Sequence, residues 1–123
     1  MAKELFAGQR KNIYRIVISK GALSKKNLVP LLNEHNKMLI ITDDGVPSKI
    51  VKKVTDICKR SGKISKIILD RGEKAKSLKN FQKILNFLAD NNFDRADLII
   101  AVGGGVVGDI SGYVASSYLR GIQ

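Results

Sequence analysis

Short apolar runs alternate with longer segments of helical periodicity along the chain. Residues 13–19 (IYRIVIS) alternate between two sets of side chains, which is typical of a strand, and residues 4–7 could pair with them as a hairpin. Residues 38–42 form a continuous apolar run, as in a strand covered on both faces. Residues 63–69 and 97–102 are expected to be the next two strands.

Helices are expected between and after these three strands. Pro47 suits the first turn of a helix that continues to about Arg60, because proline is tolerated where a helix begins. Ser77 is the expected N-cap of a second helix, whose apolar residues recur at helical spacing to about Asn91. Residues 106–117 are expected to form a third helix.

An additional helix is expected between the strands at residues 13–19 and 38–42, and its bounds stay open. Ser24 could cap a helix that runs toward His35, but Pro30 lies inside this segment. Proline removes a helical hydrogen bond, so the helix either begins near Pro30 or is kinked there.

The order of these elements predicts the fold class. Strands and helices alternate with short loops, which forces parallel strands joined by right-handed crossovers. The sequence therefore predicts an α/β fold, a doubly wound, Rossmann-like, mainly parallel sheet with helices on both faces and an N-terminal hairpin. A length of 123 residues without internal repeats or linkers fits one domain.

Composition excludes several classes of protein. No apolar run approaches the ~20 residues that span a bilayer, and the N-terminus lacks the apolar core of a signal peptide, so a cytoplasmic protein without membrane contact is expected. Cys58 is the only cysteine, which rules out an intramolecular disulfide, and it falls on the apolar face of a predicted helix. His35 is the only histidine, so no metal site is expected within this segment alone.

The net charge of +11, from 22 basic and 11 acidic residues, allows two interpretations. It could serve an anionic partner such as nucleic acid, or it could reflect a lysine-rich solvated surface. The lysines are scattered along the sequence, and no aromatic residues interleave with them as a stacking platform would need. We therefore expect no nucleic-acid partner. A basic module that binds nucleic acid is the alternative if the protein is not an enzyme.

Three loops are expected at the carboxyl ends of the strands, where doubly wound sheets bind ligands. They contain residues 43–47, 70–76 and 103–109. In the third loop, Gly103, Gly105 and Gly108 fit the pattern G-x-G-x-x-G between a strand and a helix.

The glycine-rich loop suits a diphosphate. Glycines let an anion approach the backbone, and the helix N-terminus beyond offers unpaired N–H groups and a partial positive charge. The alternative is a tight strand-to-helix turn without a ligand. The third adjacent glycine, Gly104, favours close approach.

Charged residues in the three loops could complete a dinucleotide site. Asp43 could accept two ribose hydroxyls, which would favour NAD over NADP; alternatively, Asp43 and Asp44 are turn-forming acids. Asp109, expected in the first helical turn, would be repelled by a diphosphate and should point toward hydroxyls or cap the turn. Glu73 and Lys76 could bind hydroxyls and phosphate respectively, or form a solvated pair.

Residues 99–122 (IIAVGGGVVGDISGYVASSYLRGI) resemble the signature of the 3-dehydroquinate synthase family. The segments IYRIVI, IITDDGVP and GEKAKSL also fall in family order and at family spacing, so the resemblance covers nearly the whole chain. Glycerol and iron-dependent dehydrogenases share the triple-glycine turn but do not normally continue as VVGD and SYLRGI.

The resemblance implies an N-terminal NAD-binding domain, residues 1–123, of a homodimeric carbon–oxygen lyase. The family converts 3-deoxy-D-arabino-heptulosonate 7-phosphate to 3-dehydroquinate and phosphate in the shikimate route to aromatic amino acids, using catalytic NAD⁺ and a divalent metal, zinc or cobalt. The metal ligands and most substrate-binding residues belong to a helical C-terminal domain, which this sequence lacks. The resemblance therefore implies a truncated enzyme that is inactive alone and holds no metal ligand.

Site residues follow from the resemblance by position. Those that match NAD contacts are Asp43, Glu73, Lys76, Gly104, Gly105 and Asp109, with Val106, Val107 and Gly108 completing the backbone cradle. Arg120 matches an arginine that reaches the substrate phosphate of the neighbouring subunit, a task that suits the planar guanidinium.

The chain also departs from the family pattern. Gly45 replaces a common asparagine, and Arg71 and Ala75 stand in a segment that usually reads D-G-E-x-Y-K. One NAD side-chain contact and one apolar packing contact are therefore in doubt, and Arg71 could meet a phosphate or face water. Another sugar-phosphate cyclase or a polyol dehydrogenase of the same superfamily is the alternative within enzymes.

Overall fold

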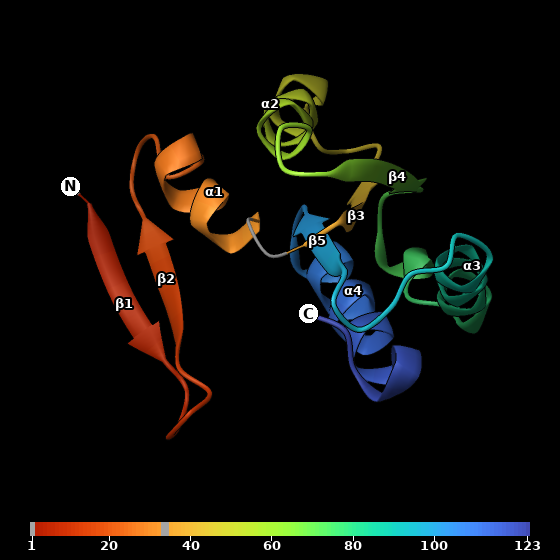
Figure 1. Cartoon of the computed structure of the whole chain (residues 1–123). Coiled ribbons are helices and arrows are strands. Elements are labelled where there is room, and N and C mark those ends of the chain that lie inside the picture. Colours follow the sequence, from red (N-terminus) through yellow and green to blue (C-terminus); the bar gives the residue numbers. More distant parts are fainter. Residues whose placement is uncertain (1, 33–34) are drawn as a thin grey trace.

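A computed structural model describes residues 2–32 and 35–123 and has the α/β fold expected from the sequence (Figure 1). Three parallel strands form its main sheet in the order β4-β3-β5. The elements of this body are β3 (Lys37–Asp43), α2 (Ser48–Cys58), β4 (Lys63–Leu69), the 3₁₀ turn η1 (Glu73–Ala75), α3 (Leu78–Asp90), β5 (Leu98–Val102), α4 (Gly105–Ser117) and the 3₁₀ turn η2 (Tyr118–Arg120).

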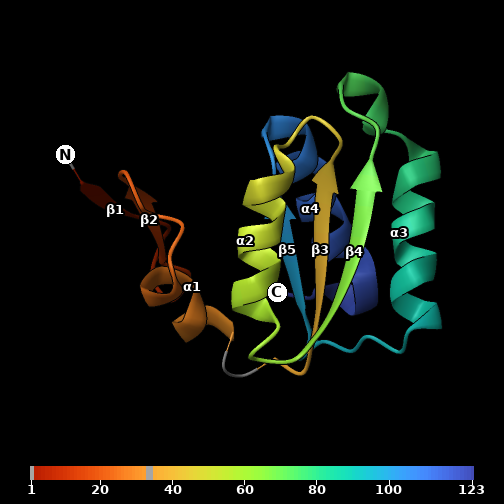
Figure 2. The ribbon, with the colours of Figure 1, turned by 90° about the horizontal axis from the view of Figure 1, so that it is seen from above.

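Helices cover both faces of the sheet, as predicted (Figure 2). Strands β4 and β5 flank β3 on opposite sides, so crossovers of one hand place α2 and α3 on opposite faces. Side chains of β3 alternate accordingly. Leu39 and Ile41 belong to the apolar cluster with α3 and α4, whereas Met38 and Ile40 belong to the cluster with α1 and α2; all four are fully buried.

The boundaries of α2, α3 and α4 follow the sequence signals to within two residues. Pro47 is the N-cap of α2 rather than a residue of its first turn, and the helix ends at Cys58 instead of Arg60. The Ser77 hydroxyl accepts a hydrogen bond from the Asn80 amide at 3.2 Å, which confirms the predicted cap of α3. None of the described helices is long and apolar enough to cross a membrane.

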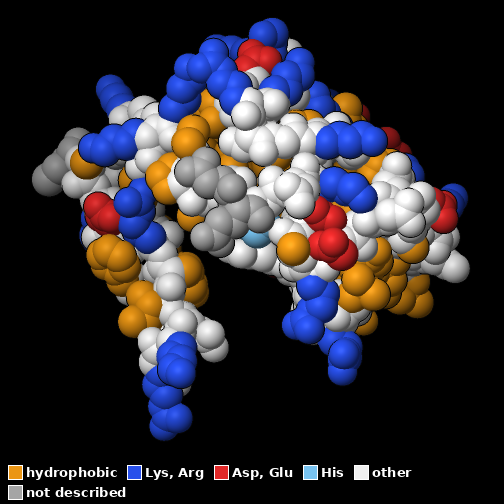
Figure 3. Space-filling view, in the orientation of Figure 1, with side chains coloured by type: hydrophobic (Ala, Val, Ile, Leu, Met, Phe, Trp, Pro, Cys, Tyr) orange, Lys and Arg blue, Asp and Glu red, His pale blue; other side chains and the backbone are white. Residues whose placement is uncertain are grey.

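The N-terminal hairpin is confirmed and stands apart from the main sheet (Figure 1). Its strands β1 (Lys3–Ala7) and β2 (Tyr14–Ile18) are antiparallel, with Leu5 paired to Ile16. Apolar side chains of both strands face solvent; the exposed fractions of Phe6 and Tyr14 are 69% and 62%. Figure 3 shows such apolar side chains on the projecting arm of the molecule.

Helix α1 (Lys25–Leu32) lies between the hairpin and α2 (Figure 2). It begins directly after Ser24 and contains Pro30, so the interpretation in which the helix starts only near Pro30 is wrong. The carbonyl of Ser24 accepts bonds from the amides of Asn27 and Leu28. The expected continuation toward His35 passes through residues 33–34, which lie outside the described residues.

The last residues of the chain return to the sheet. The amide of Ile122 donates to Ala115, and the carbonyl of Gln123 accepts from Ile99 on the outer edge of β5. The Tyr118 hydroxyl donates to the carbonyl of Phe93 at 2.6 Å, which ties the end of α4 to the segment before β5.

Candidate functional site

The three loops predicted to form the site meet at one edge of the sheet. Strand β3 is hydrogen-bonded in parallel to both β4 and β5, with Asp43 opposite Leu69 and Thr42 opposite Val102. The segments that follow the three strands therefore emerge side by side (Figure 2). Asp43 ends β3, the neighbour of the strand that leads into the glycine-rich loop. A ribose-binding acid is expected at this place relative to a diphosphate loop.

The glycines of the third loop have different structural surroundings. A Cβ added at Gly103 would lie 2.7 Å from Cγ2 of Val107, whose side chain is buried, so this glycine is required by packing. A Cβ added at Gly104, Gly105 or Gly108 would have no atom within 4 Å apart from the chain neighbours and the backbone of the helix itself. These three glycines leave open space above the backbone, which an incoming ligand could occupy.

Helix α4 begins at this open turn. Gly104 is its N-cap, with extended backbone angles (φ −84°, ψ −162°) and no capping side chain. The first amides of the helix, from Gly105 to Val107, have no partner within the helix and point out of its positive end. The helix therefore presents the open amides predicted for an anion site.

Asp109 lies in the second turn of α4, whereas the sequence predicted it in the first turn. The helix begins at Gly105 rather than Val106, which moves Asp109 into the second turn, and the first turn contains no acid. The Asp109 carboxylate bonds Nζ of Lys76 at 2.7 Å. The repulsion expected between Asp109 and a nearby diphosphate is therefore reduced by a directly bound cation.

Lys76 connects two of the loops. Its ammonium also contacts Glu73 at 3.3 Å, within the 3₁₀ turn η1 that packs on α4. The bonds from Asp109 and from Glu73, in that order, raise the pKa of Lys76 above 10.5. The Glu73–Lys76 pair, which the sequence offered as a solvated pair or as ligands of hydroxyls and phosphate, is thus part of a three-residue cluster with Asp109.

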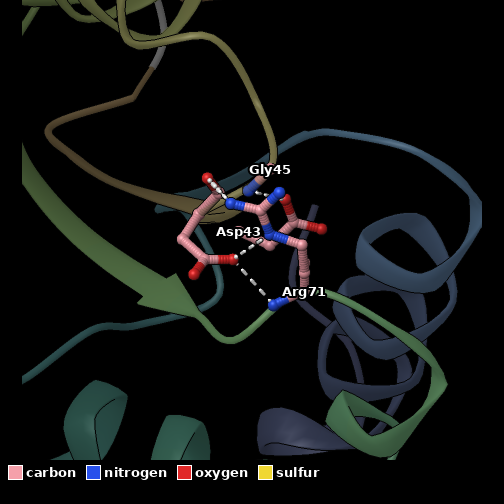
Figure 4. A network of polar contacts seen from close by, with 4 residues as sticks. Asp43, Gly45 and Arg71 are labelled. Carbon is pink, nitrogen blue, oxygen red and sulfur yellow. Dashed lines mark hydrogen bonds and ion pairs between the residues drawn. The ribbon is translucent and has the colours of Figure 1, made fainter.

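The loop after β3 is tied to the loop after β4 by side chains (Figure 4). The Gly45 amide donates to Oδ1 of Asp43 at 2.8 Å. Arg71 binds Asp44 through its main-chain amide, at 2.9 Å, and its Nε, at 3.1 Å. These bonds lower the pKa of Asp44 below 3.8, and the bond from the main-chain amide has the larger effect. Arg71 therefore binds a carboxylate of its own chain.

Ala75 is buried in the core, and Arg120 lies at the far end of α4 from the open turn. Ala75 is buried in the cluster shared by α3 and α4, so a small side chain is packed at this position. Arg120 is exposed in η2 at the opposite end of α4, about 20 Å of helix away from Gly105. Both Leu119 and Arg120 have positive φ, 48° and 64°, which is uncommon for residues other than glycine.

A hollow of about 290 Å³ lies beside the Lys76–Asp109 pair, between α3 and α4. Its walls are mainly apolar, and Phe81 and Tyr113 stack there with ring centroids 4.5 Å apart. The lining residues are Lys76, Ser77, Leu78, Phe81, Asp109, Ile110 and Tyr113. The sequence gives no signal for this hollow, because its residues belong mainly to two helices that periodicity predicts separately.

Lysines that are scattered in the sequence converge on a groove between α1 and α2. The basic residues that line it are Lys25, Lys26, Lys49, Lys52, Lys53 and Arg60, with Asp56 as the one acid. Figure 3 shows basic side chains gathered over this part of the molecule. Among the described residues, no group of three or more His, Cys, Asp or Glu side chains is arranged to hold a metal ion.

Comparison with known proteins gives consistent results. Residues 66–123 match the family model described as 3-dehydroquinate synthase N-terminal. The chain is 38% identical over 123 residues to a 3-dehydroquinate synthase of Clostridium botulinum, covering 98% of the chain and 35% of the relative. It is 41% identical over 117 residues to one of Streptococcus thermophilus, covering 93% of the chain and 33% of the relative. The chain thus spans about one third of the length of these relatives.

Solved structures share the fold. A 2-deoxy-scyllo-inosose synthase, crystallised with carbaglucose-6-phosphate, NAD⁺ and Co²⁺, superimposes with a TM-score of 0.85 at 22% identity, over 98% of this chain and 33% of the other. A 2-epi-5-epi-valiolone synthase of Streptomyces hygroscopicus, with NAD⁺ and Zn²⁺ bound, gives a TM-score of 0.66 at 25% identity, over 77% and 26% of the two chains.

Proposed function

The chain belongs to the 3-dehydroquinate synthase family, and from this we propose that residues 1–123 are the N-terminal NAD-binding domain of such an enzyme. The complete enzyme would convert 3-deoxy-D-arabino-heptulosonate 7-phosphate to 3-dehydroquinate and phosphate, as a carbon–oxygen lyase in the cytoplasm. The described third of the enzyme would bind the dinucleotide without turning over substrate.

One observation carries the proposal. Gly104 and Gly105 stand at the start of α4 with no neighbour that excludes a side chain, and neither has a positive φ. Glycine therefore has no packing role at these positions, unlike at Gly103. Close approach of an anion to the amides of the helix N-terminus gives a physical reason for both residues.

The residues at the strand ends fit NAD. The amides from Gly104 to Val107 would bind the diphosphate, with Gly108 leaving room beside them. The Asp43 carboxylate would accept the hydroxyls of the adenosine ribose. Its negative charge would oppose a 2′-phosphate, which favours NAD over NADP.

The charged cluster at η1 would complete the binding of the cofactor. Lys76 would hold Asp109 and Glu73 toward ribose or substrate hydroxyls while reducing their negative charge near the diphosphate. When bound, NAD⁺ would supply hydride chemistry, by accepting a hydride from the substrate and returning it later.

Two parts of the complete enzyme are proposed from the family alone. Zinc or cobalt would act as a Lewis acid on the substrate oxygen, with ligands outside residues 1–123. Arg120 would contact the substrate phosphate of a neighbouring subunit in a homodimer. Its position at the far end of α4 from Gly105 is compatible with a task outside its own dinucleotide site.

The test is titration of the chain with NAD⁺, NADP⁺ and inorganic phosphate, followed through the backbone amide resonances of the whole chain. We expect weak binding of NAD⁺ with shifts confined to the three loops, weaker binding of NADP⁺ and no release of phosphate from the substrate. Shifts elsewhere, or no binding at millimolar NAD⁺, would contradict the proposal.

Another sugar-phosphate cyclase is a second candidate within the superfamily, because the 2-deoxy-scyllo-inosose synthase superimposes over nearly the whole chain. Product analysis of the complete enzyme with each sugar phosphate distinguishes the two. A net reduction of NAD⁺ would instead indicate a polyol dehydrogenase. The candidate that is not an enzyme is a protein that binds polyanions, and the basic groove between α1 and α2 favours it. Micromolar nucleic-acid binding with a steep salt dependence would support this candidate.

A further inference from the structure

Arg71 and Asp44 hold the loop after β3 against the loop after β4 through both side chains and both main chains. The main-chain amide and Nε of Arg71 donate to the same Asp44 oxygen, Oδ1, at 2.9 and 3.1 Å. Nη2 of Arg71 donates to the Asp44 carbonyl at 3.1 Å, and the Asp44 amide donates to Leu69 at 3.0 Å. Four bonds therefore restrict the residue next to Asp43.

The same arginine also packs against Gly45. A Cβ at Gly45 would lie 3.5 and 3.6 Å from Cβ and Cδ of Arg71, and 3.1 Å from Oδ1 of Asp43. The aliphatic stem of Arg71 thus covers the side of Gly45 on which a side chain would stand. The Gly45 amide, held in this position, donates to Oδ1 of Asp43 and leaves the orientation of that carboxylate little freedom.

We propose that Arg71 is a positioning residue, which acts through Asp44 and Gly45 to fix the Asp43 carboxylate for the ribose of the adenosine half of a dinucleotide. This inference rests on the proposed function. One carboxylate oxygen is held by the Gly45 amide, and the other remains available to a hydroxyl. A carboxylate already oriented loses less conformational freedom when it binds the diol.

A direct role for Arg71 in binding phosphate is less consistent with the geometry. Two of its guanidinium nitrogens, Nε and Nη2, are already bonded to Asp44, whose charge opposes that of the arginine. The bonds from Arg71 lower the pKa of Asp44, so the pair stays ionised at neutral pH.

The experiment compares Arg71→Ala and Arg71→Lys with the unchanged chain, using NAD⁺, ADP-ribose and nicotinamide mononucleotide. Arg95→Ala is the matched control. Arg95 is also an exposed arginine, its side chain donates one hydrogen bond to a main-chain carbonyl, and it precedes β5 at the opposite edge of the sheet. Dissociation constants come from the amide shifts of residues 103–109.

Both Arg71 variants should weaken NAD⁺ and ADP-ribose about fivefold, the upper end for an exposed ion pair. Binding of nicotinamide mononucleotide, which lacks the adenosine ribose, should not change, and Arg95→Ala should bind all three ligands normally. Equal loss for all three ligands would indicate general loosening of the fold and overturn the inference. So would wild-type affinity in either Arg71 variant, since lysine keeps the charge but not the paired bonds. Failure of the unchanged chain to bind NAD⁺ would instead refute the proposed function.

Discussion

Alanine at Gly103 and alanine at Gly105 should have opposite consequences, although the two glycines stand two residues apart. Gly103→Ala would place a Cβ 2.7 and 2.9 Å from two carbon atoms of Val107, a residue with 1% exposure that cannot move aside. Overpacking of this kind costs about 1–3 kcal/mol. For a domain of this size each kcal/mol lowers Tm by about 4 °C, so the expected decrease is about 4–12 °C.

Gly105→Ala adds a methyl group where no atom lies within 4 Å, and it removes a glycine from a helix. Helix propensity predicts a gain of up to about 1 kcal/mol and a Tm that is unchanged or raised. The methyl group would however stand over the amides proposed to bind the diphosphate. Affinity for NAD⁺ should fall at least about tenfold, which corresponds to the loss of one charge-assisted hydrogen bond.

Thermal unfolding by circular dichroism and titration with NAD⁺ measure the two effects separately. Gly112→Ala is the control, because Gly112 is also an open glycine of α4 but lies about 10 Å further along the helix. It should raise Tm without changing the affinity for NAD⁺. The reasoning would be refuted if Gly105→Ala bound NAD⁺ normally, or if Gly105→Ala lost as much stability as Gly103→Ala.

Three further predictions concern the remaining contacts. Tyr118→Phe removes the buried bond to the Phe93 carbonyl and should lower stability by about 1 kcal/mol in denaturant titrations, whereas Tyr113→Phe, at an exposed ring, should not. Lys76→Met should weaken NAD⁺ binding, because Asp109 and Glu73 lose their cation. Since the pKa of Lys76 is raised in the folded protein, the stability that Lys76 contributes is present below pH 10.5 and lost as pH rises through the raised pKa. A stability difference between Lys76→Met and the unchanged chain that persists above that pH would contradict the assignment. The pKa of Asp44 is lowered in the folded protein, so its pH dependence runs the other way. The stability that Asp44 contributes, measured against Asp44→Asn, should be present above pH 3.8 and disappear as pH falls through the lowered pKa.

The strands and most helix boundaries could be predicted because their signals are local. Residues 38–41 are apolar without interruption because the central strand is covered on both faces. Ser77 caps α3 with its own side chain. Pro30 could not be placed, since one cap signal and one breaker signal compete within eight residues. A shift of one residue at the start of α4 was enough to place Asp109 in the wrong turn.

The contacts that organise the site could not be predicted, because they join residues far apart in the sequence. Arg71 meets Asp44 across 27 positions, and Lys76 meets Asp109 after an intervening strand and helix. With 22 basic residues and 11 acidic ones, charge alone does not select these partners. The sequence did single out both Gly45 and Arg71 as departures from the family pattern. A Cβ at position 45 would lie 3.5 Å from Cβ of Arg71, so the two departures are neighbours in the structure.

The hairpin of β1 and β2 offers an independent probe of association. A two-stranded ribbon with solvent on both sides is marginally stable in water, so its amides should exchange with deuterium far faster than those of β3. Protection of residues 3–18 that rises with protein concentration would report a neighbouring copy covering Phe6 and Tyr14. The readout needs neither substrate nor cofactor, and it separates assembly of the protein from its chemistry.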